Sequence, residues 1–278
     1  MKKYQKILSK ILLIIAIYSF ILPSTAFAQH TIKIGGTGCA LGAIKIISKD
    51  FEKAYPDIKV IVLPSIGSDG AIRAISNGAI DIGLCGRPLK ENETKLGLKV
   101  IEYAKTPFIF VANKDVNISD TDTSDIIKIY KGEKQKWFDG RRIRLILRPN
   151  EEADTLILRK ISSEVNNAVD ISKSRLGMQV ALTDQENADK IESIPGAFGT
   201  FTLTQFIAEK RSGIKILSFN GVTPNTENLT NGSYNLSKQF LIVINKDSSA
   251  LVHKFINFIK TQQGKDILEN TGNLVILK

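Results

Sequence analysis

Hydrophobic residues recur along the chain in two alternating patterns, one typical of buried strands and one typical of amphipathic helices. Short apolar runs between polar or glycine-rich turns predict strands, and apolar residues three or four positions apart predict helices. The predicted strands are 31–34, 58–63, 80–84, 107–112, 143–147, 197–200 and 240–244. The predicted helices are 41–54, 71–76, 155–164, a short helix opened by the capping box Thr183–Glu186, 203–210, 251–260 and 264–269. This alternation predicts an α/β protein with mostly parallel sheets flanked by helices.

Two predicted strands, 107–112 and 240–244, are apolar, bounded by polar turns and far apart in the sequence. We interpret them as two crossings between lobes. One lobe then combines residues 29–110 with 240–278, and residues 111–239 form the other. The length of 278 residues suits two α/β lobes of roughly 100–150 residues each.

The first residues follow a different pattern, that of an export signal. Four lysines at positions 2, 3, 6 and 10 precede an uncharged, mostly apolar run over 11–22, and Ala26-Phe27-Ala28 offers a small-x-small cleavage site. This run is shorter than the ~20 residues that a membrane-spanning helix needs, although an uncleaved anchor is the alternative. We therefore expect residues 1–28 to be a cleaved signal peptide and the mature protein to be periplasmic.

Composition excludes several classes of protein. A hydrophobic content of 43% is that of a globular chain rather than a disordered one. Two cysteines and two histidines argue against a disulfide-dense scaffold and a histidine metal centre, and we expect no cofactor. The net charge of +10, about +6 without the four signal lysines, indicates scattered surface lysines or a basic cleft for an anion. Nucleic acid is disfavoured by the export signal and the lack of an aromatic-rich basic motif.

Three loops that follow predicted strands are rich in glycine and small polar residues. They are 35–40 (GGTGCA), 64–70 (PSIGSDG) and 84–88 (LCGRP). Glycine allows a ligand to approach the backbone, and helix amino ends and hydroxyl groups supply hydrogen-bond donors. Such loops meet at the carboxyl edge of a parallel sheet. One such loop alone is equally typical of an ordinary turn, but three together predict an anion-binding cradle.

A fourth loop, Arg148–Thr155, follows the predicted strand 143–147. An arginine at a strand end beside a helix amino end suits bidentate binding of a tetrahedral oxyanion. Asn150 or Asp154 is a candidate cap for the following helix. The alternative is a surface arginine paired with Glu151 or Glu152.

The order of these motifs resembles the phosphate-type solute-binding proteins of ABC importers. The similar segments are 34–38, 65–72, 81–89, 148–155, 195–200 and 234–242. The resemblance implies a type II periplasmic-binding fold, in which two lobes joined by two crossing strands clamp the ligand. It also implies a monomeric binding protein rather than an enzyme, which captures inorganic phosphate or a related oxyanion and delivers it to an ABC transporter permease.

The resemblance also implies a set of ligand-binding residues. In the second loop Ser68 is the expected serine, with Ser65 as the alternative, and the third loop contributes Gly86 or Arg87. The complete set is Thr37, Gly38, Cys39, Ser65, Ser68, Asp69, Gly86, Arg87, Arg148, Asp154 and Thr155.

The fourth loop departs from the family pattern Arg-x-x-Gly-Ser-Gly-Thr, because residues 150–154 read Asn-Glu-Glu-Ala-Asp here. Three carboxylates repel a fully ionised anion. They fit if they point to solvent, pair with Arg148 or Arg87, or accept a hydrogen bond from a protonated oxyanion. A different oxyanion, an organophosphonate or another small acid therefore stays open as the ligand.

Three further alternatives stay open. Cys39 and Cys85 follow neighbouring strands, and we hypothesise a disulfide between them, the alternative being two separate buried thiols.

A periplasmic sensor or adhesion module on the same fold is a second function. A secreted phosphoester hydrolase is a third, but His30 and His253 are poorly placed as bases and no G-x-S-x-G motif occurs.

Overall fold

The computed structural model describes residues 30–277. The predicted signal peptide, residues 1–28, and its cleavage site lie outside the described residues. All that follows concerns residues 30–277. Within residues 30–277, no helix is both long and apolar enough to cross a membrane.

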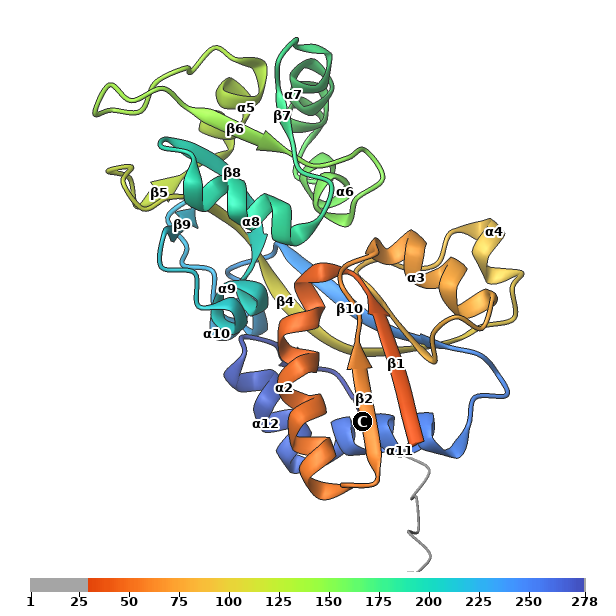
Figure 1. Ribbon diagram of the computed structural model, residues 1–278. Helices are drawn as coiled ribbons and strands as arrows, with labels where there is room; N and C mark the ends of the chain where they lie inside the picture. Colours follow the sequence, from red (N-terminus) through yellow and green to blue (C-terminus); the bar gives the residue numbers. More distant parts are fainter. Residues whose placement is uncertain (1–29, 278) are drawn as a thin grey trace, which may run out of the picture. The chain divides into compact units, whose positions relative to one another are not determined.

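Helices and strands alternate, as the hydrophobic pattern predicts (Figure 1). The helices are α2 (Gly38–Ala54), α3 (Gly67–Ser76), α4 (Glu91–Thr94), α5 (Thr123–Lys131), α6 (Ala153–Arg159), α7 (Ser163–Ser174), α8 (Asp184–Ser193), α9 (Leu203–Glu209), α10 (Thr226–Thr230), α11 (Ala250–Lys260) and α12 (Gln262–Asn270). The strands are β1 (His30–Gly36), β2 (Ile58–Val62), β3 (Ile82–Cys85), β4 (Lys99–Asn113), β5 (Asp120–Thr121), β6 (Arg144–Leu147), β7 (Gln179–Val180), β8 (Ala197–Thr202), β9 (Ile214–Phe219), β10 (Ser237–Ile244) and β11 (Leu274–Val275).

The strands form a mixed sheet in the order β2-β1-β3-β10-β4-β8-β6-β7. The pairs β1–β3 and β6–β8 are parallel, whereas β10 runs antiparallel to both β3 and β4. The long strand β4 links two parts of this sheet. Its first half pairs with β10, and from Phe108 onward it pairs with β8 and β9.

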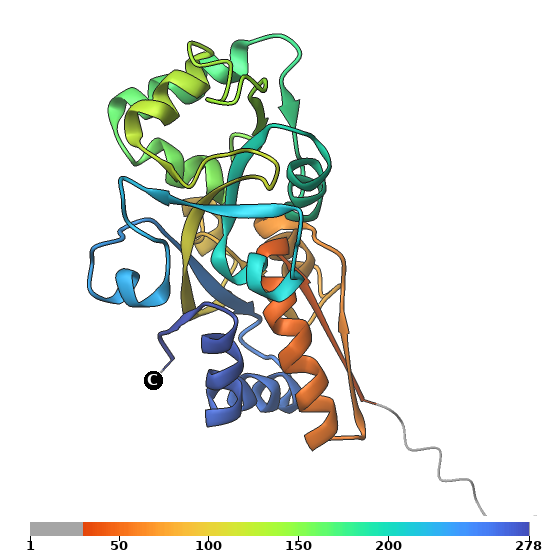
Figure 2. The same cartoon turned by 90° about the vertical axis from the view of Figure 1, so that its left-hand side faces the viewer.

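Each part of the sheet has its own main hydrophobic core, with a smaller cluster beside it. In the first, segments from both ends of the chain lie side by side, with α2 against α11 and α12 (Figure 2). Phe51 of α2 contacts Phe255 and Phe258 of α11 edge to face, at 5.0 and 5.5 Å between ring centroids. The second core is built from the middle of the chain, where Phe110 stacks on Phe198 at 6.1 Å. The predicted α/β class is confirmed.

One helix prediction is wrong. The segment 155–164 is not a single helix, because α6 ends at Arg159 and α7 begins at Ser163. Ser162 caps α7 by accepting a hydrogen bond from the Val165 amide at 3.2 Å. A serine at an N-cap satisfies a backbone donor that would otherwise lack a partner, and this favours a new helix start. The predicted cap Thr183 of α8 is confirmed, since its hydroxyl accepts from the Glu186 amide at 3.1 Å.

Candidate functional site

The three glycine-rich loops lie together at the carboxyl ends of β1, β2 and β3. The Ile66 amide donates to Gly36 O at 3.1 Å, and the Gly86 amide donates to Ser68 Oγ at 3.0 Å. The first loop passes so close to β3 that a Cβ on Gly36 would lie 2.1 Å from Leu84 O. Gly36 also has a φ of +152°, which side-chain-bearing residues rarely adopt. Glycine is therefore required where the first and third loops meet.

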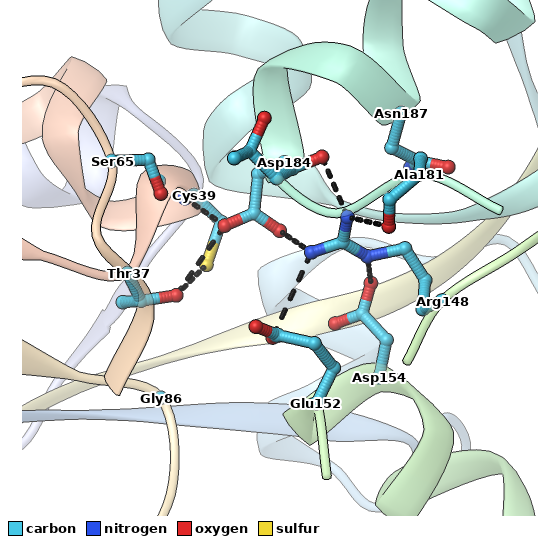
Figure 3. Close-up of polar contacts among 12 residues, drawn as sticks. Thr37, Cys39, Ser65, Gly86, Arg148, Glu152, Asp154, Ala181, Asp184 and Asn187 are labelled. Atoms are coloured by element: carbon cyan, nitrogen blue, oxygen red, sulfur yellow. Dashed lines mark hydrogen bonds and ion pairs between the residues drawn. The ribbon is translucent and has the colours of Figure 1, made fainter. Parts of the chain in front are cut away.

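The fourth loop reaches this cluster from the other part of the sheet, through Arg148 at the end of β6 (Figure 3). The guanidinium of Arg148 donates to the carbonyls of Ala181 at 2.8 Å and Thr183 at 2.6 Å. Its side chain is only 2% exposed. Although burial lowers the pKa of Arg148, neighbouring carboxylates, Asp184 first, raise it above the usual value. Arg148 is thus a fixed, buried positive charge.

The Nε of Arg148 differs from the other two guanidinium nitrogens, which both donate hydrogen bonds. Its Nε is buried and has no hydrogen-bond partner among residues 30–277, since Asp154 Oδ2 is 3.9 Å away. A buried N–H without an acceptor is costly, and such groups need a functional explanation. An oxygen of a bound anion is the kind of acceptor that suits it.

Asp184, the first residue of α8, connects the two sides of the site. Its Oδ1 accepts from Arg148 Nη2 at 3.1 Å, and its Oδ2 accepts from the Cys39 amide at 2.9 Å and Thr37 Oγ1 at 3.4 Å. The Cys39 amide belongs to the first turn of α2, where free N–H groups and the helix dipole favour negative charge. Burial alone raises the pKa of Asp184, but Lys238 and Arg148 hold it below its usual value.

Lys238 of β10 provides the second buried cation. Its Nζ donates to Asp154 Oδ1 at 2.7 Å, and the side chain is fully buried. Burial lowers the pKa of Lys238, yet the adjacent Asp154 carboxylate raises it well above its usual value. Neither Lys238 nor Asp184 is among the predicted site residues. Their partners lie 84 and 36 residues away in the sequence, so no local spacing could identify them.

The carboxylates of the fourth loop show two of the three expected arrangements, because one points to solvent and another lies beside Arg148. Glu151 points to solvent with 73% of its side chain exposed, 3.7 Å from Lys90. Glu152 lies 3.7 Å from Arg148, and its pKa is raised by burial and by Asp184. Asp154 pairs with Lys238. Arg148 is therefore a buried residue at the centre of the cluster and not a surface arginine.

Seven of the predicted site residues fall into two groups. Thr37, Cys39, Arg148 and Asp154 surround Asp184 or its immediate partners, while Ser65, Ser68 and Gly86 hold the neighbouring loops together. Thr155 points its hydroxyl at the Arg148 carbonyl, 3.2 Å away. Arg87 and Asp69 pair with each other, and Arg87 also bonds both carboxylate oxygens of Glu93 at 2.8 Å. Within residues 30–277 this second ion cluster makes no hydrogen bond or ion pair with Arg148, and ligand binding by the whole set stays a prediction.

The hypothesised disulfide is wrong, because Cys39 and Cys85 are both buried free thiols. The two sulfurs have different partners. Cys39 Sγ lies 3.2 Å from Thr37 Oγ1 in the first turn of α2, and Cys85 Sγ faces the Ser68 carbonyl at 3.8 Å. Cys85 is the last residue of β3, whereas Cys39 already belongs to α2.

We expect both thiols to be nearly inert in the native protein. Burial raises the pKa of Cys39 and of Cys85 to about 12. At neutral pH this leaves roughly a thousandfold less thiolate, the reactive form, than an unperturbed cysteine has. A thiol reagent at pH 8 without reductant is expected to label no cysteine in the folded protein and both in guanidinium chloride. Absence of labelling in guanidinium chloride would instead indicate a disulfide.

A cavity of about 580 Å³ adjoins the site. Its lining includes Gly86, Ala153 and Lys238 and the apolar Leu156 and Phe219. Among residues 30–277, no group of three or more histidine, cysteine or acidic side chains is arranged to hold a metal ion.

Several known proteins are similar to this chain in sequence or in fold. The Borreliella burgdorferi phosphate-binding protein PstS is 25% identical over 258 residues, which cover 89% of this chain and 91% of that protein. A substrate-binding protein assigned to a phosphate ABC transporter of Clostridium perfringens, solved with bound phosphate, superposes with a TM-score of 0.76 at 21% identity. The superposition covers 89% of this chain and all of that one. The ABC-type phosphate transport receptor of Vibrio cholerae gives 0.62 at 19% identity, over 87% of this chain and 99% of the receptor.

These neighbours share the two-lobed fold of type II periplasmic binding proteins, and the predicted fold class is confirmed. The sequence model described as the PBP superfamily domain matches residues 23–262, most of the chain. This chain therefore belongs to the PBP superfamily and is similar to its phosphate-binding members.

Proposed function

We propose that this protein captures phosphate, or a closely related tetrahedral oxyanion, between its two lobes and delivers it to an ABC importer. One observation carries the proposal: Arg148 from one lobe and the Thr37 hydroxyl and Cys39 amide from the other already converge on a single carboxylate. An arrangement that binds one oxyanion group has the donors to bind another. The names of the similar proteins support phosphate as the ligand.

Buried hydrogen-bond donors from both lobes are expected to bind the oxyanion. Arg148 supplies charge and orientation, including its unpartnered Nε, and the amino end of α2 supplies the Cys39 amide. Both groups are buried, and hydrogen bonds to an anion are stronger in a site that excludes water. Because the protein only binds and releases its ligand, no nucleophile or general base is required.

The remaining parts of the proposal concern the whole chain. Residues 29–110 with 240–278 form one lobe and residues 111–239 the other, and closure of the lobes traps the ligand. Residues 1–28 direct export to the periplasm, where the protein works as a monomer beside its permease. The two separate cores and the crossing strand β4 support the division into lobes.

Calorimetric titration of the purified protein tests the proposal. Phosphate, sulfate, molybdate and methylphosphonate are added separately at constant ionic strength. We expect one of the tetrahedral oxyanions to bind with one-to-one stoichiometry, and phosphate to bind best. If none of the four ions produces heat or raises the melting temperature, the proposal fails.

A further inference from the structure

The carboxylate of Asp184 occupies the hydrogen-bond donors that the proposed function assigns to the bound oxyanion. Asp184 is the first residue of α8, a helix separate from both the first and the fourth loop. Figure 3 shows its two oxygens pointing in opposite directions, one toward Arg148 and the other toward Thr37 and Cys39. Asp184 is buried, so these contacts are not shared with solvent.

The same atoms cannot serve Asp184 and an external anion together. A backbone amide has one hydrogen to donate, and the Cys39 amide already donates it to Asp184 Oδ2 at 2.9 Å. A phosphate oxygen placed there would also meet a carboxylate of the same charge in a buried environment, where repulsion is poorly screened. One of the two anions must therefore leave.

The close packing around Asp184 indicates a specific contact between the lobes. A Cβ on Gly38 would lie 2.9 Å from the Asp184 Cβ, so only glycine allows α8 to come this close to α2. The next residue, Gln185, donates from Nε2 to the Gly38 carbonyl at 3.2 Å. Asp184 and Gln185 thus bind the amino end of α2 through both its donors and an acceptor.

The charges of the site also indicate that Asp184 and a bound anion compete for the same cations. Arg148 and Lys238 are the buried cations of the site, and Asp154 and Asp184 are the fully buried carboxylates. Glu152 adds a further, partly exposed carboxylate 3.7 Å from Arg148. With Asp184 in place, no positive charge is left over for a ligand. Counting Glu152, three carboxylates face two cations, so withdrawal of Asp184 makes the cluster neutral and frees all three donors at once.

We propose that Asp184 is an internal competitor of the oxyanion: its carboxylate holds the anion-binding donors and latches α8 to α2 until the ligand displaces it. This inference rests on the proposed function for the identity of the ligand. The structural latch itself does not depend on it. Asp184 is then the residue that sets the affinity of the site by limiting the fraction of molecules ready to bind.

The first experiment compares phosphate affinity in Asp184→Ala, Asp184→Asn and the unaltered protein by calorimetry. Asp184→Ala is expected to bind phosphate about tenfold or more tightly, because the apparent Kd is the intrinsic value divided by the binding-competent fraction. Asp184→Asn keeps the shape but loses the charge, so a smaller gain is expected. The matched control is Asp189→Ala, on the same helix but 66% exposed and paired with Arg211, which should leave the affinity unchanged.

A second experiment separates the latch from the identity of the ligand. Formate has the size of the carboxylate removed in Asp184→Ala, and it should raise the melting temperature of that variant by about 2–4 °C or more at saturation. It should not stabilise the unaltered protein or Asp189→Ala. Stabilisation by formate without phosphate binding to any form would refute the proposed function and keep the latch.

The opposite result is equally informative. If phosphate binds the unaltered protein and folded Asp184→Ala with equal affinity, or binds the variant more weakly, Asp184 is not a competitor. The proposed function would then stand and this inference would be overturned. Circular dichroism establishes folding, and Asp184→Asn provides the same comparison if the alanine variant is unstable.

Discussion

Arg148→Ala is expected to weaken phosphate binding by roughly 30- to 4,000-fold. Truncating one partner of a buried, hydrogen-bonded charge pair costs about 2–5 kcal/mol, and each 1.4 kcal/mol is about a factor of ten in affinity. Arg148 is almost fully buried and is the only guanidinium that contacts Asp184 among residues 30–277. Calorimetric titration with phosphate measures the loss.

Two further variants make this result interpretable. Arg148→Lys keeps the positive charge but lacks the planar fork, so it should bind phosphate with intermediate affinity. Arg144→Ala removes an exposed arginine at the other end of the same strand, β6, and should bind phosphate normally. Wild-type affinity in a folded Arg148→Ala protein would place the anion site elsewhere.

The sequence predicts the elements of this fold well where local signals and packing agree. The helix expected at 251–260 closely matches α11, because its apolar stripe packs into the first core. The strand expected at 107–112 covers only part of β4, whose preceding residues 99–106 are more polar. Those residues are held in the sheet by pairing with β10, a strand over 130 residues away in the sequence. Pairing of that kind has no local signature.

In the candidate site, too, some residues have a local sequence signal and others are identified only by contacts between residues far apart in the sequence. The loops around Thr37 and Ser68 follow the neighbouring strands β1 and β2, and strand topology brings them together. Arg148 follows β6 in the other part of the sheet, and Asp184 connects it to the first loop. The sequence indicates Asp184 only as part of a helix start, because a capping box explains an acidic residue there without any further role. Its contact with the Cys39 amide joins residues 145 positions apart, and it appears only when both lobes are in place.

The pair formed by Lys238 and Asp154 is expected to contribute strongly to stability. Lys238→Met should lower the free energy of unfolding by about 3–5 kcal/mol, because it leaves a buried carboxylate without its closest partner. For a chain of this size the melting temperature should fall by roughly 6–20 °C. Because the folded-state pKa of Lys238 lies above its usual value, its contribution is fully present at neutral pH. It is lost only as the pH rises through that raised pKa.

Thermal and chemical unfolding of three proteins distinguish this pair from an ordinary surface contact. Lys105→Met removes a lysine from the adjacent strand β4 that is 43% exposed and 3.9 Å from Glu102, so it should cost no more than about 1 kcal/mol. The double variant Lys238→Met with Asp154→Asn removes both charges and should recover much of the stability lost in Lys238→Met, because no uncompensated carboxylate remains. A cost for Lys238→Met as small as that of Lys105→Met would show that Asp154 finds an equally good partner in Arg148, whose Nε lies 3.9 Å away.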